Sequence, residues 1–429
     1  MKIGFSTVVG FLTAALVLLP ALTTAAVIIP LGHSPFDFEY ERFYRAGVAA
    51  QGFDYLPSTG PFLLNQVEEI FNIKDNPAID LLEINNTSSL RLLGIGSERY
   101  VTARHRQGDD LPVIRAGYTA RLSRYFSLLA LVSMDRGKAI DPEYTGKKYR
   151  GLAGEVETAG LFFQNDDLHL ALGRFRTFWG PQKTNLLLSH TAEPLDQLSA
   201  RYEKGRLILN FLFARLDGSH PNAADSLRFP GRSFSDNRYL AGHRLDIRFH
   251  KRFRAGFFET VLFGGEGRPP ELYYLNPLQF FHSAQLNENE DDNTILGFDF
   301  TALLGKGASA YGQILIDDFQ IDDASQGDQE PNEMAYMLGL FKTGRVGTFL
   351  PDLKIEYVRI ANRTYHQADP RNRYIYRNKL LGHPLGPDAD SLSFKARFWP
   401  SDGFFAEIEF AYRRKGEGSI EALWDEPWL

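Results

Sequence analysis

From about residue 80 to its end, the chain alternates apolar and polar positions with a period of two. In residues 243–249, Leu245, Ile247 and Phe249 share one face, opposite a row of charged side chains. This alternation is typical of β-strands whose two faces meet different environments. The same period recurs in residues 100–106, 111–121, 157–164, 205–216, 252–263, 297–304, 311–319, 336–342, 353–361, 391–398 and 404–412.

The length of these segments favours a membrane barrel over a soluble sandwich. A strand that crosses a membrane at a tilt needs ~9–11 residues, whereas strands of soluble proteins average ~5–6. One face carries full charges, which need water, and the other carries Leu, Ile and Phe, which need hydrocarbon. Residues 80–429 therefore predict an all-β fold, a transmembrane antiparallel β-barrel, and at roughly 20 residues per strand they provide about 16 to 18 strands.

The first 79 residues differ in pattern. Residues 1–26 have Lys2, a long apolar run and a small-residue end at Ala25-Ala26, which is typical of a secretory signal peptide rather than a membrane anchor. Residues 27–79 then show helical spacing. Ser34-Pro35 predicts a helix start, and a second apolar stripe from Leu63 to Phe71 predicts a second helix that pairs with the first as a hairpin.

The stretch from Leu168 to Asp196 begins as an ordinary strand and then breaks. Leu168, Leu170 and Leu172 alternate with smaller residues, but Trp179-Gly180-Pro181 cannot continue a ladder, because Pro has no N–H to donate. We therefore expect this segment to leave the wall and pass into or over the lumen, with Arg174 and Trp179 ordering it. The polar stretches 221–232, 287–293, 322–333 and 367–387 are predicted to be long extracellular loops.

Composition narrows the possible partners. The formal charge of −6 gives no basic footprint for nucleic acid. The chain has no cysteine, which excludes thiolate metal sites and disulfides. Its 34 Phe and 19 Tyr suit the aromatic girdles of a barrel at the two lipid interfaces. From the sequence we expect no cofactor and no metal.

Two acidic pairs and one Ser-His pair are candidates for chemistry. Asp291-Asp292 and Asp317-Asp318 do not have the spacing of a calcium loop, which favours solvated loop or lumen charges over metal or catalytic carboxylates. Ser189-His190 lacks the Gly-x-Ser-x-Gly elbow of a hydrolase. We therefore expect no enzymatic activity.

A third candidate is aromatic. Tyr273, Tyr274 and Asn276 lie in Tyr-Tyr-Leu-Asn-Pro, where Asn276-Pro277 ends the alternation. One interpretation is an interfacial aromatic belt. The other is a platform for sugar rings, whose C–H faces stack on aromatic rings while their hydroxyls bind Asn, Asp, Arg or Glu.

Four stretches together resemble the Wzi-like capsule-assembly proteins of the outer membrane. They are Gly173-Arg174 with Trp179-Gly180-Pro181 and Leu186-Leu187-Leu188-Ser189, then Tyr274-Leu275-Asn276-Pro277, then Asp291-Asp292-Asn293 with Leu296-Gly297-Phe298-Asp299, and Ile316-Asp317-Asp318-Phe319. The start at Ile29-Pro30-Leu31-Gly32 is similar too. The resemblance implies an 18-stranded barrel with a small periplasmic helical segment, acting as a lectin for capsular polysaccharide.

Three functions remain as hypotheses. The first is a non-enzymatic outer-membrane barrel whose lumen is plugged by loops and which binds capsular or other exopolysaccharide. The second is a porin-like channel for small solutes, which is distinguished by whether Arg174, Trp179 and Asp317-Asp318 block the bore. The third is an outer-membrane lipid hydrolase. The expected partners are outer-membrane lipid, surface polysaccharide and the barrel assembly machinery, with the N-terminal segment in the periplasm.

Overall fold

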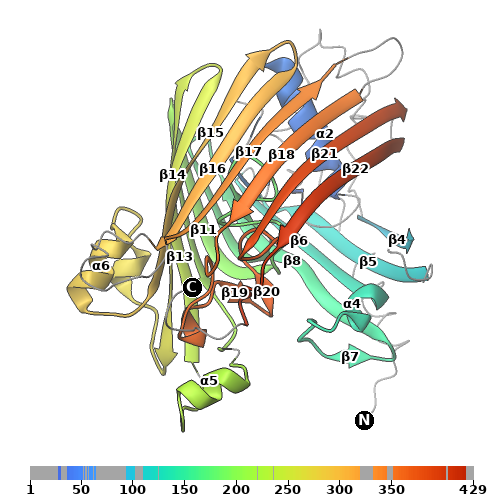
Figure 1. Ribbon diagram of the computed structural model, residues 1–429. Coiled ribbons are helices and arrows are strands. Elements are labelled where there is room, and N and C mark those ends of the chain that lie inside the picture. Colours follow the sequence, from blue (N-terminus) through green and yellow to red (C-terminus); the bar gives the residue numbers. More distant parts are fainter. Residues whose placement is uncertain are drawn as a thin grey trace.

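The computed structural model describes residues 28–29, most of 36–63, 93–101, 110–318 except 124, 220 and 235, then 332–344, 351–401 and 404–421. One 16-stranded antiparallel sheet contains most of the strands and curves round on itself (Figure 1). Fifteen of these strands form the curved wall among the described residues, and the sixteenth is the two-residue strand β7 (Lys148–Tyr149), which lies in a connection outside it. The expected all-β barrel architecture is confirmed, and among the described residues β4 and β22 form the two edges of the sheet.

Strands adjacent in the sheet are also consecutive along the chain, apart from short strands outside the wall, so the wall is an up-and-down meander. Its strands are β4 (Leu93–Val101), β5 (Asp110–Arg121), β6 (Phe126–Asp135), β8 (Leu152–Gln164), β9 (Leu168–Phe175), β11 (Leu195–Lys204), β12 (Leu207–Arg215), β13 (Asp236–His250), β14 (Phe253–Glu266), β15 (Asn293–Gly305), β16 (Ala308–Asp318), β17 (Glu333–Thr343), β18 (Pro351–Ile360), β21 (Ala389–Ser401) and β22 (Phe404–Lys415).

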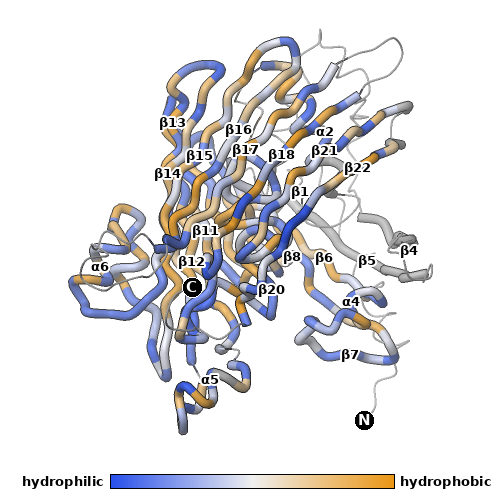
Figure 2. The backbone as a smooth tube through the Cα atoms, in the orientation of Figure 1, coloured by the Kyte–Doolittle hydropathy of each residue, from blue (hydrophilic) through white to orange (hydrophobic). Residues whose placement is uncertain are grey.

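The alternation along the sequence becomes two faces of this wall. In one row, Phe257 pairs with Phe298 and Phe298 with Ile314, and these outward side chains lie in an exposed apolar belt. On the inward face, the charged side chains of Arg244 and Asp246 are fully buried. Figure 2 shows hydrophobic and hydrophilic positions alternating along the strands. The outward belt is the surface that a barrel presents to lipid.

The two ends of the wall have connections of different length. At the end that we call the short-turn end, β13 joins β14 through residues 251–252, and β15 joins β16 through residues 306–307. The other, long-loop end has larger connections: 136–151 with α4 (Arg136–Ile140) and β7 (Lys148–Tyr149), 216–235 with α5 (Ala223–Arg228), 267–292 with η2 (Leu272–Leu275) and α6 (Phe281–Glu288), and 361–388 with η4 (Pro370–Asn372), β19 (Ile375–Tyr376) and β20 (Lys379–Leu380). The described parts of the predicted extracellular loops lie at this end.

The predicted first helix is α2 (Phe36–Ala50), which lies in the concavity of the sheet near the short-turn end (Figure 1). Tyr44 Oη lies 3.3 Å from Ser309 Oγ at the start of β16, and Arg45 Nε lies 2.8 Å from Asp352 Oδ1 at the start of β18. The helix buries its aromatic face against the inner wall instead of standing alone, as the marginal stability of short helices requires.

Other expectations for the N-terminal region fall outside the described residues. These are the signal peptide, residues 1–26, and most of the second helix, although Leu63, expected on that helix, lies in the short strand β3 (Phe62–Leu63), which pairs with β1 (Ile28–Ile29). The periplasmic position of residues 27–79 stays a prediction. None of the described helices has the length and apolar character needed to span a membrane.

Candidate functional site

Two chain segments leave the wall at the long-loop end and fold into the lumen. We call residues 178–192 and 361–388 the plug. Within it, Trp179 N donates to Leu188 O at 3.0 Å, Ser189 N donates to Leu381 O at 2.9 Å, and Tyr365 Oη donates to Leu186 O at 2.5 Å. The two segments therefore hold each other through backbone and side-chain hydrogen bonds.

The plug forms one apolar core with the inner wall. Its side chains pack against inward residues of the consecutive strands β11 to β18, so along this part of the wall the lumen is filled by protein. The plug members of the core are Trp179, Leu186, Leu187, Leu188, Ala192, Tyr365, Tyr374, Tyr376 and Leu381, and the wall members include Leu212, Leu240, Leu262, Ile295, Leu315, Met337, Val358 and Ile360. Burial of this apolar surface provides the main stabilisation of the plug.

Gln313 on β16 fastens the plug to the wall. Its Oε1 accepts the N–H of Leu186 at 2.6 Å, and its Nε2 donates to Trp179 O at 3.3 Å. Gly180 beside it has φ of +143°, and a Cβ there would lie 2.4 Å from Asn185 Oδ1 and 2.9 Å from Gln313 Nε2. The Trp-Gly-Pro break therefore needs glycine at this position for both conformation and space.

An N-terminal segment passes beneath the plug. Strand β2 (Thr59–Gly60) pairs with β10 (Phe178–Trp179), and Ser58 Oγ donates to Asp246 Oδ2 at 2.8 Å. Arg244 forms ion pairs of 2.5 Å with both Asp246 and Asp299 in the buried interior. These side chains satisfy one another where water is excluded, as buried charges must.

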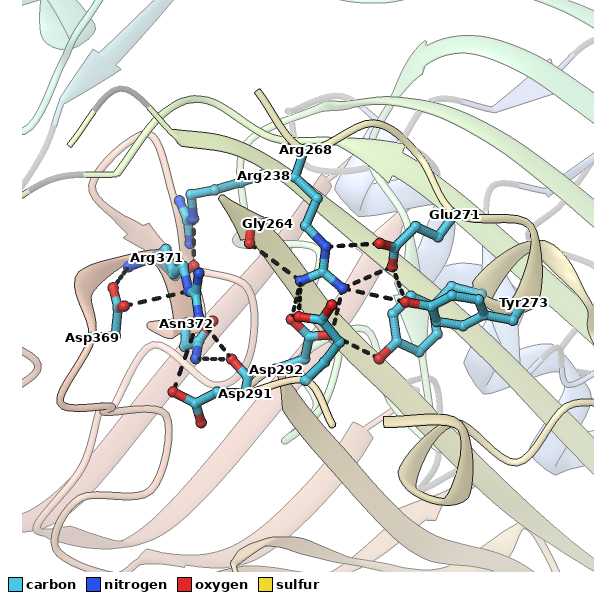
Figure 3. Close-up of polar contacts among 12 residues, drawn as sticks. Arg238, Gly264, Arg268, Glu271, Tyr273, Asp291, Asp292, Asp369, Arg371 and Asn372 are labelled. Carbon is cyan, nitrogen blue, oxygen red and sulfur yellow. Dashed lines mark hydrogen bonds and ion pairs between the residues drawn. The ribbon is translucent and has the colours of Figure 1, made fainter. Parts of the chain in front are cut away.

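A polar cluster, which we call the clamp, ties the loop 267–292 together (Figure 3). Its members are Arg268, Glu271, Tyr273, Tyr274 and Asp292. Arg268 forms ion pairs with Glu271 at 2.7 Å and with Asp292 at 2.6 Å, and Tyr274 Oη donates to Asp292 Oδ2 at 2.7 Å. Burial opposes the charge of Arg268, but hydrogen bonds to Glu271 and Asp292 outweigh it and raise its pKa. Burial also raises the pKa of Tyr274, which keeps its hydroxyl as a donor.

Beside the clamp, side chains from three loops meet in a surface that we call the crown: Phe229, Arg232, Asp291, Asp369 and Arg371. Asp369 forms ion pairs with Arg232 at 2.7 Å and with Arg371 at 3.3 Å. The Arg232 guanidinium lies 5.5 Å from the Phe229 ring centroid. Asp291 has a side chain 86% exposed, 4.0 Å from Arg371 (Figure 3).

The crown combines the groups that carbohydrate recognition uses. An aromatic ring can stack on the C–H face of a sugar, while guanidinium groups and carboxylates exchange hydrogen bonds with its hydroxyls. The ion pairs of Asp369 with Arg232 and Arg371 set the geometry of these three side chains before any ligand arrives. The crown is therefore the surface of the long-loop end with the chemistry best suited to a polar polymer.

The structure places the predicted site residues in different surroundings. Trp179 lies in the plug core, and the Asp317 carboxylate accepts the N–H of Tyr365 at 2.5 Å, so both help to hold the plug. Asp318 follows at the end of β16 and is half-buried. Arg174 shares the outward face with Leu172 and forms an ion pair with Asp196 across β9 and β11.

The aromatic candidates lie around the clamp. The Tyr274 ring is completely buried, and Tyr273 is half-buried with its hydroxyl donating to Glu271. Asn276 is exposed, and its Oδ1 accepts the N–H of Leu278 at 3.1 Å. Asp291 contributes to the crown, whereas Asp292 is buried in the clamp. The buried members thus position the loop, and Asn276 and Asp291 are the members that reach its surface.

Neither Ser189-His190 nor the acidic pairs form an evident reactive centre. Ser189 Oγ lies 2.8 Å from Thr191 Oγ1, and His190 Nδ1 lies 3.0 Å from Lys183 O, so the two side chains are occupied by different partners. Within the part of the chain that the structure describes, no three His, Asp or Glu side chains gather closely enough to hold a metal ion.

Sequence reasoning did not identify Arg232, Arg268, Gln313, Asp369 or Arg371. Arg268 directly follows the glycine-rich residues 264–267, whose composition indicates only a turn. Charged residues in polar loops are ordinary, so nothing in their local pattern distinguishes a clamp or crown member. Only the meeting of loops that are far apart along the chain reveals them.

The sequence profile of a family described as capsule assembly protein Wzi matches residues 115–426 of this chain. The fold is similar to the solved structure of Wzi from Escherichia coli, described as an outer membrane protein involved in group 1 capsule assembly and a carbohydrate-binding β-barrel. That similarity has a TM-score of 0.62 and 13% identity, and it covers 91% of this chain and 86% of that chain.

Other outer membrane proteins show weaker similarity to the chain. The outer membrane channel DcaP of Acinetobacter baumannii has a TM-score of 0.36 and 9% identity, with 70% of this chain and 78% of that chain covered. A loop-deletion mutant of the outer membrane protein OmpT of Vibrio cholerae has a TM-score of 0.36 and 11% identity, with 72% and 86% covered. These scores are too low to support an argument about function. No curated protein matches the sequence significantly.

Proposed function

Because the chain belongs to the capsule assembly protein Wzi family, we propose that it binds polysaccharide at the cell surface as a barrel of the Gram-negative outer membrane. The short-turn end and α2 face the periplasm, and the long-loop end faces outward, because barrels of this membrane have short periplasmic turns and long extracellular loops. Lipid surrounds the outward belt, and the barrel assembly machinery inserts the chain.

The filled lumen is the observation that carries the proposal. The plug packs into the long-loop end through an apolar core that it shares with β11 to β18, and Ser58, Arg244 and Asp246 occupy the interior beneath it. When the lumen holds a packed core, the groups that can contact a large ligand lie on the surface of the loops. This arrangement of the described residues favours binding at the surface over a porin-like channel for small solutes.

The crown is the proposed contact surface for the polymer. Phe229 provides a partly exposed ring, Asp291 an exposed carboxylate, and Arg232 and Arg371 provide planar donors. Asn276 is a further donor and acceptor on the loop 267–292, which also provides Asp291. Several weak contacts of this kind, repeated along a polymer, combine into useful avidity. Binding alone requires no reaction, and the proposal includes no catalytic step.

Binding of purified surface polysaccharide to the full chain in lipid nanodiscs tests this function. Substituting Asp291→Ala with Arg371→Ala is expected to lower retention of the polymer on immobilised protein. The matched control is Lys204→Ala, an exposed charge at the short-turn end. Equal retention by the crown variant and the control would remove the crown from the site, and no retention by the unsubstituted protein would contradict the function itself.

Conductance measurements distinguish the plugged barrel from a porin-like channel. A porin-like channel would give steady open currents in planar bilayers, whereas the plugged barrel is expected to give almost none. Steady large currents from the unsubstituted protein would overturn the proposal that the lumen is closed.

A further inference from the structure

Residues 268–290, which include η2 and α6, pack on the outside of the wall, and we call them the outer lobe. Figure 1 shows α6 projecting away from the sheet beside β13 and β14, on the side opposite the lumen. Tyr274, Phe281 and Ala284 of the lobe form a buried cluster with outward-facing wall residues, namely Tyr239, Ala241, Val261 and Phe263. The lobe therefore does not join the plug but covers part of the outward face.

A buried carboxylate fixes the lobe to that face. Glu259 shares the outward face of β14 with Val261, and it accepts the backbone N–H of Phe281 at 2.9 Å and of His282 at 2.8 Å, at the start of α6. His243 Nε2 lies 3.2 Å from the same carboxylate. Glu259 is 2% exposed, so the lobe shields a charge from the surroundings of the wall. An unshielded carboxylate facing hydrocarbon would cost several kcal/mol.

The lobe itself exposes large apolar side chains. Leu272 is 83% exposed, Leu278 81%, Leu286 67% and Phe280 52%. These residues stand on an element mounted on the outward face, where Phe257, Phe298 and Ile314 form part of the apolar belt. Nearer the short-turn end, Phe253 and Phe257 of β14 belong to that belt.

The length of β14 places the lobe at the outer-leaflet side of the belt. The strand has 14 residues, whereas ~9–11 suffice to cross a membrane at the usual tilt. The lobe packs on Val261 and Phe263, close to the long-loop end of the strand. We call Arg268 and Glu290, at the two ends of the lobe, its charged margin. They lie 3.4 Å apart, and Glu290 directly precedes Asp291 of the crown. Exposed apolar side chains close to charged ones are typical of elements that lie at the membrane interface.

We propose that the outer lobe is an interfacial anchor, whose Leu272, Leu278, Phe280 and Leu286 insert into the lipid of the outer leaflet. The lipid belt of the wall would then extend over the lobe without interruption. The anchor would also hold the barrel at a fixed depth, because its charged margin cannot follow the apolar residues into hydrocarbon. This role does not depend on what the crown binds.

Site-directed nitroxide labels test the proposal directly, because the chain has no cysteine that would compete for the label. Leu278→Cys and Leu286→Cys are labelled in the full chain and reconstituted in vesicles of outer-membrane lipid. Collision of each label with oxygen, which partitions into lipid, is compared with collision with a water-soluble nickel chelate. Phe257→Cys on the belt is the lipid control, and Asp291→Cys on the crown is the water control.

Lobe labels in lipid should show an oxygen-to-nickel collision ratio close to that of the Phe257 label and several-fold above that of the Asp291 label. A ratio equal to that of the Asp291 label would overturn the anchor, since the lobe would then lie in water. Labels shielded from both reagents would also overturn it, because protein, such as a second copy of the chain, would cover the lobe. Heat-modifiable migration on gels, which folded barrels show, is used to check that each labelled variant has folded. A variant that fails this check is replaced by Leu272→Cys.

Discussion

The side-chain amide of Gln313 accepts the backbone N–H of Leu186 at 2.6 Å, although the two residues lie 127 positions apart. Gln313 belongs to the wall and Leu186 to the plug. The same amide donates to Trp179 O at 3.3 Å, so one wall side chain satisfies two backbone groups of the plug. Closure of the lumen therefore depends on directed polar contacts as well as on apolar packing.

Gln313→Leu is expected to loosen the plug. The substitution keeps an apolar volume but leaves Leu186 N–H and Trp179 C=O without their partner, at a cost of about 1–3 kcal/mol for a buried polar group. The free energy of unfolding measured in urea should fall by that order, and brief current openings should appear in planar bilayers. Gln279→Leu, in the outer lobe, is the control. Unchanged stability and currents would contradict a fastening role for Gln313.

Trp179→Ala and Arg174→Ala should have different effects on the plug, although the sequence predicted that both residues order it. Trp179 is buried in the plug core, and truncating such a side chain costs about 3–5 kcal/mol. Arg174 forms a partly exposed outward pair with Asp196, and exposed pairs contribute about 0–1 kcal/mol. Amide exchange of residues 178–192 should therefore accelerate strongly in the first variant and little in the second. Similar acceleration in both would show that Arg174 also orders the plug.

The pair Arg373 and Asp225 should behave as a buried ion pair that joins two loops. Two hydrogen bonds of 2.6 and 2.8 Å connect them, and both side chains are almost completely buried. Removing one partner leaves an uncompensated charge, which costs about 3–5 kcal/mol. In a double-mutant cycle with Arg373→Met and Asp225→Leu, unfolding free energies should show strong coupling, whereas the outward pair Arg174 and Asp196 should show almost none. Additive losses in the first cycle would refute the coupling.

The period-two pattern predicted the wall because successive side chains of a strand point to opposite faces, so a strand between water and lipid is encoded by adjacent residues. It identified residues 252–263 and 391–398, which lie in β14 and β21. It did not identify β6 and β11. β6 has the nearly continuous apolar run Phe126–Val132, and β11 mixes Ser, Ala and Arg, so that alternation is weak in both.

The site was predicted less completely because its contacts are not local. Trp-Gly-Pro correctly indicated a departure from the wall, since Pro181 cannot donate to a ladder and Gly180 must take positive φ. The alternation that places Leu172 on the outward face also places Arg174 there, but the pairing of Arg174 with Asp196 depends on the register of β9 with β11, which no local pattern encodes. Asp369 becomes part of the crown only through its contact with Arg232, which lies 137 residues away along the chain.

His383 should make the plug sensitive to acid. Its Nδ1 accepts the N–H of Leu385 at 3.2 Å, which requires the neutral ring, and burial lowers its pKa from 6.5 to about 4. The unfolded chain therefore binds the proton more readily than the folded chain, and stability from this group is complete above pH 6.5 and is lost as pH falls toward about 4.

Amide exchange of residues 361–388 between pH 7 and pH 4, corrected for the intrinsic pH dependence of exchange, measures this loss. The unsubstituted protein should lose protection across that range, whereas His383→Asn, which keeps an acceptor but cannot titrate there, should lose distinctly less. His250→Asn, an exposed histidine on the short-turn side, controls for general acid effects. Equal losses in the protein and in His383→Asn would assign the acid response to other groups and contradict the role of the buried imidazole.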